Sequence, residues 1–298
     1  MRRLTDAPAC VRRAFFVLAL LSAATAVGGP TSGPADRTPP AYLQFGKPDQ
    51  EEGRAALAAF RQAGIPGQYY LEFDLRVLPR RGDERTLAGR LWGARNDQGA
   101  VTRISVTGAN SKDRHLLVQN GEEAKVWSVD LGGEASSTTR IVDAFEPLLP
   151  GVELTAFDLA MPYLYWADAT LEKLARVRSR PTHVFLFRPP PAWAAGHPEF
   201  SGVRAYLDTQ FNVPVQTELI GRDGRVVRTL SLVDLAKVGD QYLPKSIDLR
   251  NEATRDKVRF QVTAAALNLK LPAALFEPGQ LAEKISPPPA GQVQRVAP

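Results

Sequence analysis

The stretch VRAYLDTQFNVPVQTELIGRDGRVVRTLSLV, residues 203–233, decides the fold because it contains three apolar-polar runs in direct succession. Asp223-Gly224 separates the second run from the third and is a tight-turn sequence. Two further runs follow, at Tyr242–Arg250 and Lys257–Thr263. The last of them alternates Val258, Phe260 and Val262 with charged or polar residues, as a half-buried strand does. The pattern predicts five consecutive strands joined as hairpins.

The first half of the chain also has alternating apolar and polar residues separated by turn sequences. In Tyr69–Pro79 (YYLEFDLRVLP), the apolar residues alternate with Glu72, Asp74 and Arg76. Further strand patterns follow as far as Leu131, with Asn-Gly and Asp-Gln-Gly turns between them. A meander of about ten or eleven strands must curl into a barrel or a sandwich to hide its edges. We therefore predict a mainly β fold with some helix, a half-open antiparallel β-barrel closed by short covering helices.

Two segments have helical patterns. Asp49 can cap a helix that carries Leu57 and Phe60 on one face and ends near Gly64. Thr155–Trp166 (TAFDLAMPYLYW) has a capping box and then apolar residues at helical spacing. Pro162 must break this second helix, kink it or start another short one. The sequence predicts that this second segment forms a lid, which consists of Phe157, Met161, Leu164 and Trp166.

The N-terminus has the pattern of a secretory signal peptide. Arginines precede the apolar run Ala14–Leu21, and Ala24-Thr25-Ala26 forms an A-x-A cleavage site. Residues 1–26 hold four arginines and one aspartate, so their removal lowers the formal net charge from +5 to +2. Basicity is then no argument for nucleic-acid binding. We expect an exported, periplasmic protein that is cleaved near Ala26 and lacks cysteine, because Cys10 leaves with the signal.

Composition divides the remainder into three parts. Residues 27–48 are rich in Pro and Gly and predict an extended linker, and residues 286–298 predict a similar Pro-rich tail. The folded domain is expected at residues 49–285.

Signatures of catalysis and of metal binding are lacking in the sequence. It contains no GxSxG, HExxH, P-loop or GxGxxG motif, and its three histidines are widely scattered. Asp158 and Asp168 flank the lid, but capping and a solvated turn explain them better than a paired-carboxylate site does. His183 shares a strand face with two phenylalanines and is best explained as a core histidine. We expect no catalytic residues, no metal and no cofactor.

The alternating apolar residues of the strands predict that the concave face of the curved sheet is hydrophobic. The expected lipid-facing residues are Leu71, Phe73, Leu75, Ile104, Val106, Leu219, Ile247, Leu249, Phe260 and Val262. If a helix fills this face, it is an ordinary core, and if helices cover only its mouth, it is a cavity. Burial of ~200 Å² of acyl chain would contribute on the order of 5 kcal/mol before losses.

Several segments in order resemble the lipoprotein-localisation (LolA-like) carriers, in their broader outer-membrane lipoprotein-sorting branch. They are the hairpin QNGEEAKVWSVD (119–130), the segment PGVELTAFDLAMPYLYW (150–166), the run from Val203 to Leu230 and the closing LPAALFEPGQL (271–281). The resemblance covers about residues 65–281. It implies a barrel with an apolar cavity for lipoprotein acyl chains. The gating arginine of the best-known carriers has no clean counterpart, since Arg90, Arg95 and Arg103 all lie nearby.

The resemblance and the residues together favour one function and leave a second open. The first is an exported lipid or lipoprotein carrier in sorting to the outer membrane, a monomer with an inner-membrane donor and an outer-membrane acceptor as partners. The second is an envelope sensor or regulatory interaction domain with the same fold. The sequence does not distinguish them, and an enzyme is disfavoured because no nucleophile–base set is recognisable.

Overall fold

A single antiparallel sheet makes up most of the protein. The computed structural model describes residues 47–297, except 109–112, 133–137 and 211–212, so the predicted signal peptide and nearly all of the predicted linker lie outside the described residues. The sheet order is β6-β5-β4-β3-β2-β1-β13-β12-β11-β10-β9-β8-β7, with β14 paired to β13 beside this path. The strands are β1 (Gln68–Leu78), β2 (Arg85–Asn96), β3 (Gly99–Thr107), β4 (Asp113–Gln119), β5 (Lys125–Leu131), β6 (Arg140–Val142), β7 (Ala169–Val177), β8 (Arg180–Phe187), β9 (Phe200–Asp208), β10 (Pro214–Gly221), β11 (Val226–Val238), β12 (Gln241–Asn251), β13 (Lys257–Leu269) and β14 (Gln294–Arg295).

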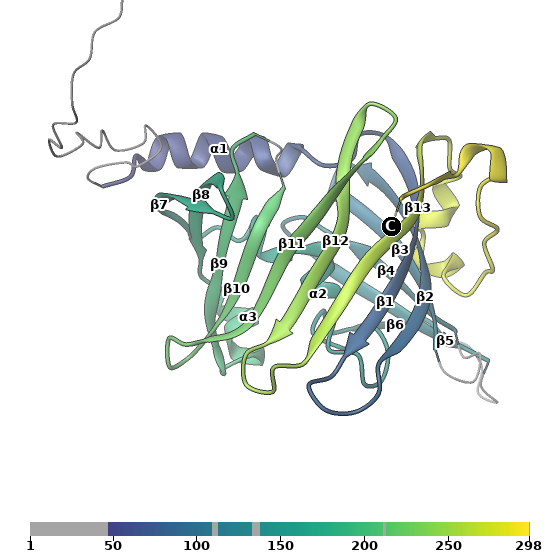
Figure 1. Ribbon diagram of the computed structural model, residues 1–298, viewed down its shortest axis with the longest axis horizontal. Coiled ribbons are helices and arrows are strands. Elements are labelled where there is room, and N and C mark those ends of the chain that lie inside the picture. The colour runs from purple at the N-terminus through teal and green to yellow at the C-terminus, as the bar shows by residue number, and fades with distance from the viewer. Residues whose placement is uncertain (1–46, 109–112, 133–137, 211–212, 298) are drawn as a thin grey trace, which may run out of the picture. The chain divides into compact units, whose positions relative to one another are not determined.

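The sheet is open, and the predicted half-open antiparallel β-barrel with short covering helices is confirmed (Figure 1). Its 14 strands exceed the predicted ten or eleven. The additional strands are β6, β7 and β14, whose sequences carry weak strand patterns. β6 and β14 have only three and two residues. In β7 a register shift between Leu171 and Lys173 interrupts the apolar alternation.

The two halves of the meander meet where β1 pairs with β13, from Gln68↔Leu269 to Leu78↔Lys257. The turns behave as their residues predict. In the β2–β3 turn, the Asn96 Oδ1 atom accepts hydrogen bonds from the backbone N–H groups of Gln98 (3.1 Å) and Gly99 (3.2 Å). Gly99 has φ +138°, a conformation that disfavours side chains. This turn chemistry fixes the register and so places alternate residues on the concave face.

Three α-helices accompany the sheet, namely α1 (Gln50–Gln62), α2 (Ala156–Ala160) and α3 (Pro191–Gly196). The Asp49 side chain caps α1 by accepting from the N–H groups of Glu51 and Glu52. Gln50 then fixes the helix to β7, because its amide donates to the Leu171 carbonyl (2.8 Å) and accepts from the Leu171 N–H (3.0 Å). No helix within the described residues is long and apolar enough to cross a membrane.

The chain after β13 turns back over the convex face of the sheet through the short 3-10 helices η3 (Ala273–Phe276) and η4 (Pro278–Gln280). Arg103 of β3 holds this segment and is 1% exposed. Its guanidinium donates to four backbone carbonyls, those of Leu275 (3.3 Å), Gln280 (3.0 Å), Leu281 (2.9 Å) and Glu283 (2.6 Å). Burial lowers the pKa of Arg103 to about 10, so the group stays charged at neutral pH.

The segment expected as an extended tail also returns to the sheet. Gln294 and Arg295 pair with Ala265 and Ala264 of β13, and the Val296 N–H donates to the Thr263 carbonyl (2.9 Å). The ladder between β12 and β13 stops at Ser246↔Gln261, two residues after Pro244, which has no N–H to donate. The tail therefore covers part of β13 that β12 leaves unpaired.

Arg103→Met should destabilise the protein by about 3 kcal/mol or more, because four carbonyls, two of them in buried contacts, lose a charged donor. Urea unfolding measures the change. Arg90→Met is the matched control, since Arg90 is exposed on the neighbouring strand, and it should cost less than about 0.5 kcal/mol. Equal stabilities of the two variants would contradict the role assigned to Arg103.

Acid should weaken the same region through His115, whose Nδ1 lies 3.0 Å from the Leu281 carbonyl. Burial lowers the pKa of His115, so the unfolded chain takes up the proton more readily than the folded chain. The free energy of unfolding should therefore fall as pH drops below about 6.5. Burial lowers the pKa of His183 in the same direction. His115→Gln should show a smaller fall in urea unfolding than the wild type, and an identical pH profile would exclude His115 as a source.

Candidate functional site

The two edges of the sheet are joined by one stretch of chain. β6 and β7 end the sheet order on opposite sides, yet they follow one another in sequence. Residues 143–168, named here the crossing segment, connect them and contain α2 and the 3-10 helix η2 (Pro162–Tyr165). Figure 1 shows α2 behind β11 and β12, on the side of the sheet opposite the viewer. The crossing segment thus lies against the concave face, where the sequence places the apolar residues.

The ten predicted lipid-facing residues lie in two adjoining apolar clusters. Eight are buried in one cluster, with Ile247 partly buried against it. Leu219 belongs to the second cluster, beneath β8–β10. The Phe73 and Phe260 rings stack at the centre of the first cluster with centroids 4.5 Å apart. The eight are Leu71, Phe73, Leu75, Ile104, Val106, Leu249, Phe260 and Val262.

The crossing segment fills this face with side chains that the sequence-based prediction did not single out. Its buried members in the first cluster are Leu148, Leu149, Val152, Leu154 and Ala156. The predicted lid began at Thr155, whereas the apolar cover begins seven residues earlier. A Pro-Gly turn interrupts this stretch, so it has neither a helical nor a strand period that could identify it. In this conformation the crossing segment packs against the concave face with these side chains.

The predicted lid residues cover the second cluster. Phe157, Leu164 and Trp166 are buried there, and Met161 is partly buried between both clusters. Met161 has φ 53° and ψ 53°, the left-handed conformation, at the junction of α2 and η2. Pro162 disfavours continuation of α2 through Met161 and begins the second short helix at its own position. The predicted effect of Pro162 is confirmed.

Aromatic rings join the lid to the Pro-rich loop after β8. Phe157 lies 4.3 Å from Phe145, and Trp166 lies 5.0 Å from Trp193 of α3, centroid to centroid. Trp193 also packs on His197 at 4.3 Å. These rings meet at tilted or stacked angles, as aromatic pairs in protein cores do, and they join the lid to α3 as one apolar cluster.

A buried ion pair holds α2 to the sheet. Thr155 and Asp158 form the predicted capping box, and the same Asp158 carboxylate accepts from Arg228 of β11 at 2.9 Å. The side chains of Asp158 and Arg228 are only 7% and 20% exposed. The Arg228 guanidinium also lies over the Phe145 ring, 5.7 Å from its centroid. Loss of one partner would leave the other buried without compensation, so removal of either charge alone should be strongly destabilising.

Other polar contacts hold the crossing segment near its ends. Arg61 of α1 donates to the Leu164 (2.5 Å) and Trp166 (3.3 Å) carbonyls, and Asn120 donates to the Ala160 carbonyl. At the other end, Arg114 donates to the Pro147 carbonyl (3.1 Å) and to Glu146 (2.5 Å), and Asn251 donates to Glu153 (3.1 Å). The interior of the segment is held mainly by apolar packing.

Two hollows flank the crossing segment at opposite ends of the half-barrel. One of about 590 Å³ lies between α1, the β2–β3 and β4–β5 turns and Tyr165. The other, about 500 Å³, is bounded by Phe145, Val152 and Thr155 on one side and by Arg228, Val77 and Val258 of the sheet on the other. Both therefore reach the crossing segment from outside, at its two ends.

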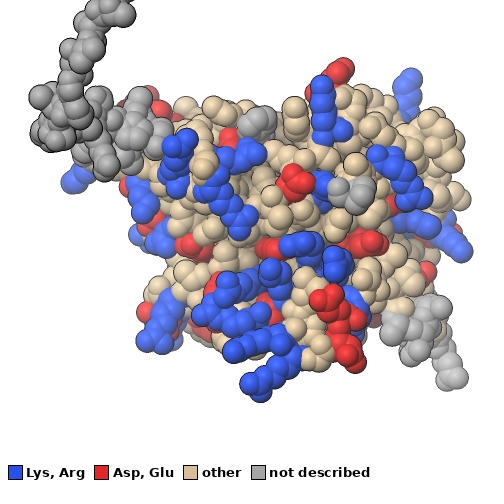
Figure 2. All heavy atoms as spheres, viewed as in Figure 1, with Lys and Arg blue, Asp and Glu red and all other residues tan. Residues whose placement is uncertain are grey.

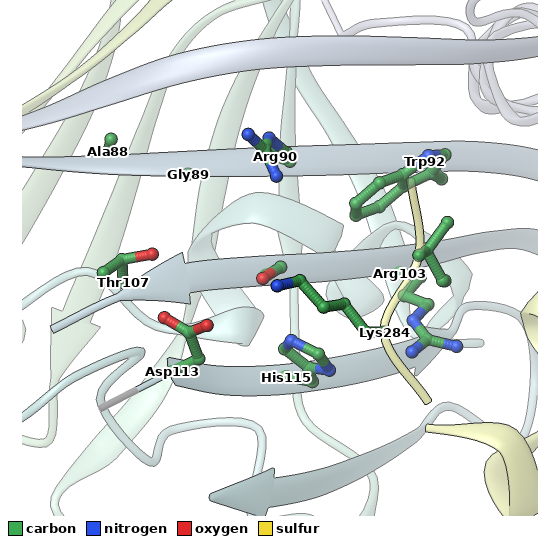
Figure 3. Close-up of a pocket in the computed structure, with 11 residues that line it drawn as sticks. Ala88, Gly89, Arg90, Trp92, Arg103, Thr107, Asp113, His115 and Lys284 are labelled. Carbon is green, nitrogen blue, oxygen red and sulfur yellow. The ribbon is translucent and has the colours of Figure 1, made fainter. Parts of the chain in front are cut away.

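The three arginines near the expected gating position lie elsewhere. Arg103 holds the C-terminal segment on the convex face, and Arg95 donates to the Arg61 carbonyl at the end of α1 (2.8 Å). Arg90 borders a hollow of about 140 Å³ on the convex face, together with Asp113, His115 and Lys284 (Figure 3). Of the three, only Arg95 touches an element that contacts the lid.

The side chains considered as acid–base groups make structural contacts. Asp168 pairs with Arg188 (3.3 Å) on the surface, and Asp158 pairs with Arg228 as described. His183 is partly buried, with its ring 6.3 Å from that of Phe185, and burial lowers its pKa. The described residues include no group of three or more His, Cys, Asp or Glu side chains that could hold a metal ion.

Comparison with known proteins identifies the fold. A family model described only as like an uncharacterized protein matches residues 148–283, from the crossing segment to the C-terminal segment. No curated protein matches the sequence. Among solved structures, an outer membrane lipoprotein-sorting protein domain from Vibrio parahaemolyticus matches with TM-score 0.66 and 14% identity, over 79% of this chain and 100% of that one.

Two further solved structures have a similar fold. A DUF1329 family protein from Desulfovibrio piger matches with TM-score 0.64 and 13% identity, over 78% of this chain and 98% of that one. A LolA superfamily protein from Nitrosomonas europaea matches with TM-score 0.58 and 12% identity, over 75% of this chain and 96% of that one. The resemblance drawn from the sequence is thus confirmed for the fold: the chain adopts the half-open β-barrel of LolA superfamily proteins and outer membrane lipoprotein-sorting domains.

Proposed function

We propose that this protein is an exported carrier that shields acyl chains of lipids or lipoproteins against the concave face of the half-barrel. The observation that carries the proposal is the crossing segment, which covers one continuous apolar face with its own apolar side chains. The fold shared with lipoprotein-sorting domains supports the same class of cargo. In this role the protein works as a monomer in the periplasm, receives cargo from an inner-membrane donor and delivers it to an outer-membrane acceptor.

Binding is an exchange in this mechanism. An incoming acyl chain replaces Leu148, Val152 and Leu154 against the sheet, so one apolar contact is lost for each that forms. Such an exchange has a small net free energy, which allows a carrier to release its cargo. The cost that remains is the ion pair of Asp158 with Arg228, which must separate or move as a unit when the segment opens.

A second function, an envelope sensor or regulatory interaction domain, would use the same opening to present a surface to a protein. The edge strand β6 offers one, since Ile141 is 68% exposed beside an unpaired strand edge. Transfer of bound lipid to acceptor membranes supports the carrier, whereas a stable complex with a membrane protein and no transfer supports the sensor.

The four tryptophans allow a test that locates the bound acyl chain. Trp166 and Trp193 belong to the cluster under the lid, and Trp92 and Trp127 belong to clusters on the convex face. A brominated fatty acid quenches only tryptophans that it approaches closely. We expect strong quenching in Trp92→Phe/Trp127→Phe, which keeps the inner pair, and little in Trp166→Phe/Trp193→Phe.

The two double variants are matched, because each changes two indoles to phenylalanine and keeps two. Melting curves establish that both fold. Quenching that survives only in Trp166→Phe/Trp193→Phe would place the ligand on the convex face. Absence of quenching in the wild type would overturn the carrier function.

The ion pair should control the rate of opening. In Asp158→Asn/Arg228→Gln the charges disappear together, so neither is left buried alone, and the segment loses its strongest anchor. We expect faster amide hydrogen exchange at residues 156–166 and faster association of a fluorescent acyl probe, by about tenfold for each 1.4 kcal/mol of anchoring lost. Asp168→Asn/Arg188→Gln is the control at an exposed pair, with an expected effect near zero. Equal association rates in both variants would exclude the pair as the barrier.

A further inference from the structure

Three connections meet at one end of the half-barrel. The strand register brings them together, because Leu78 pairs with Lys257 and Arg228 pairs with Asn251. The Arg80 N–H also donates to the Asp256 carboxylate at 2.7 Å, directly between two of the loops. The three stretches, named here the basic end, are residues 76–85, 221–228 and 250–257.

This end carries the excess positive charge of the whole chain. Its three stretches contain ten Lys and Arg residues against five Asp and Glu. The whole chain has 37 Lys and Arg residues and 32 Asp and Glu residues. Outside the basic end, 27 positive and 27 negative residues remain, so their charges cancel. Figure 2 shows Lys and Arg side chains gathered along the lower part of the visible face, where Figure 1 places the loops below β10–β13.

Arg228 and Lys257 pair with Asp158 and Asp248, which lie outside the basic end. The carboxylates within the basic end do not neutralise its other cations. Glu252 is shared by Arg250 (3.7 Å) and Arg255 (2.9 Å), so one negative charge faces two positive ones. Three exposed arginines form no ion pair with any described residue. They are Arg80, Arg81 and Arg222. Unpaired guanidiniums on loop tips can reach phosphate oxygens without losing an existing partner.

The basic end also surrounds an entrance to the crossing segment. The hollow of about 500 Å³ described above opens here, with Phe145, Val152 and Val258 among its apolar lining. Its charged lining consists of three cations and three carboxylates, namely Arg85, Arg228, Lys257, Asp83, Glu153 and Asp256. The unpaired arginines of the basic end, at the same end as these apolar walls, match the order of groups in a phospholipid, a phosphate above hydrocarbon.

From this geometry we infer that the basic end docks on the anionic surface of a phospholipid bilayer and turns the hollow beside Phe145 toward the lipid. The choice of a bilayer over other anions rests on the proposed carrier function. Each basic residue near an anionic membrane strengthens binding by a factor of about five, so three unpaired arginines together strengthen it about a hundredfold. An acyl chain can then pass between bilayer and half-barrel with little exposure to water.

Sedimentation of the full chain with vesicles tests the inference. The vesicles are phosphatidylcholine alone or phosphatidylcholine mixed with phosphatidylglycerol. We expect binding only to the mixed vesicles, weakening as salt screens the charges. Arg80→Gln/Arg81→Gln/Arg222→Gln should lower the partition coefficient at least about tenfold. The matched control is Arg54→Gln/Lys237→Gln/Lys270→Gln, which removes three exposed charges away from the basic end and should bind like the wild type.

Three results would overturn the inference: no binding to mixed vesicles, equal losses in both triple variants, or equally tight binding of heparin, which would mark an unselective polyanion site. Circular dichroism verifies that the variants fold, since all six residues are exposed. Quenching by brominated fatty acid, measured without vesicles, separates this result from the carrier function. If the Arg80/Arg81/Arg222 variant loses vesicle binding but keeps quenching by the acyl chain, docking and acyl binding are distinct and both stand. If the wild type binds mixed vesicles but shows no quenching, docking stands and the carrier function fails.

Discussion

The two edges of the sheet, β6 and β7, are consecutive in the chain, and a single segment must join them across an open half-barrel. A curved sheet of this length leaves one apolar face without a second sheet to cover it. The connection therefore serves two purposes, since it closes the topology and buries the face. Its composition follows from this position, with Leu148, Leu149 and Leu154 directed into the core and polar anchors near each end. A surface loop of ordinary polar composition would leave the sheet exposed to water.

A cover of this kind differs from a helix packed by regular ridges and grooves. α2 has five residues, η2 has four, and Met161 between them adopts a left-handed conformation. Short helices contribute little stability of their own, so tertiary contacts hold them in place. These contacts are apolar and therefore replaceable by hydrocarbon, apart from the Asp158–Arg228 pair and the peripheral hydrogen bonds. The proposed exchange therefore requires rearrangement of this segment and not of the sheet.

Residue patterns predicted the sheet better than its cover. Period-two alternation in β1 and β13, and the turn residues at Asn96 and Gly224, define strands and register locally, so the sequence contains the needed information. The edges β6 and β7 have short or interrupted patterns, because an edge strand is stabilised from one side only. The role of Arg103 could not be assigned from sequence, since its four carbonyl partners lie about 170 or more positions away. Every residue has a backbone carbonyl, so the residue types at these positions do not identify them as acceptors. The apolar side chains from Leu148 to Leu154 were also not predicted to cover the sheet. Irregular backbone has no periodic spacing of apolar residues that would identify its buried side.

The distribution of charge complements that of the apolar groups. Strand register brings three connections to one end, and these alone account for the net positive charge of the chain. The same end holds the hollow beside Phe145, where the crossing segment leaves the sheet edge. An apolar face alone would make a carrier bind hydrocarbon in any orientation, and a basic surface alone would bind any polyanion. In the proposed carrier function, their junction at one end would give a direction to the exchange, with the headgroup phosphate held outside and the acyl chain against the crossing segment.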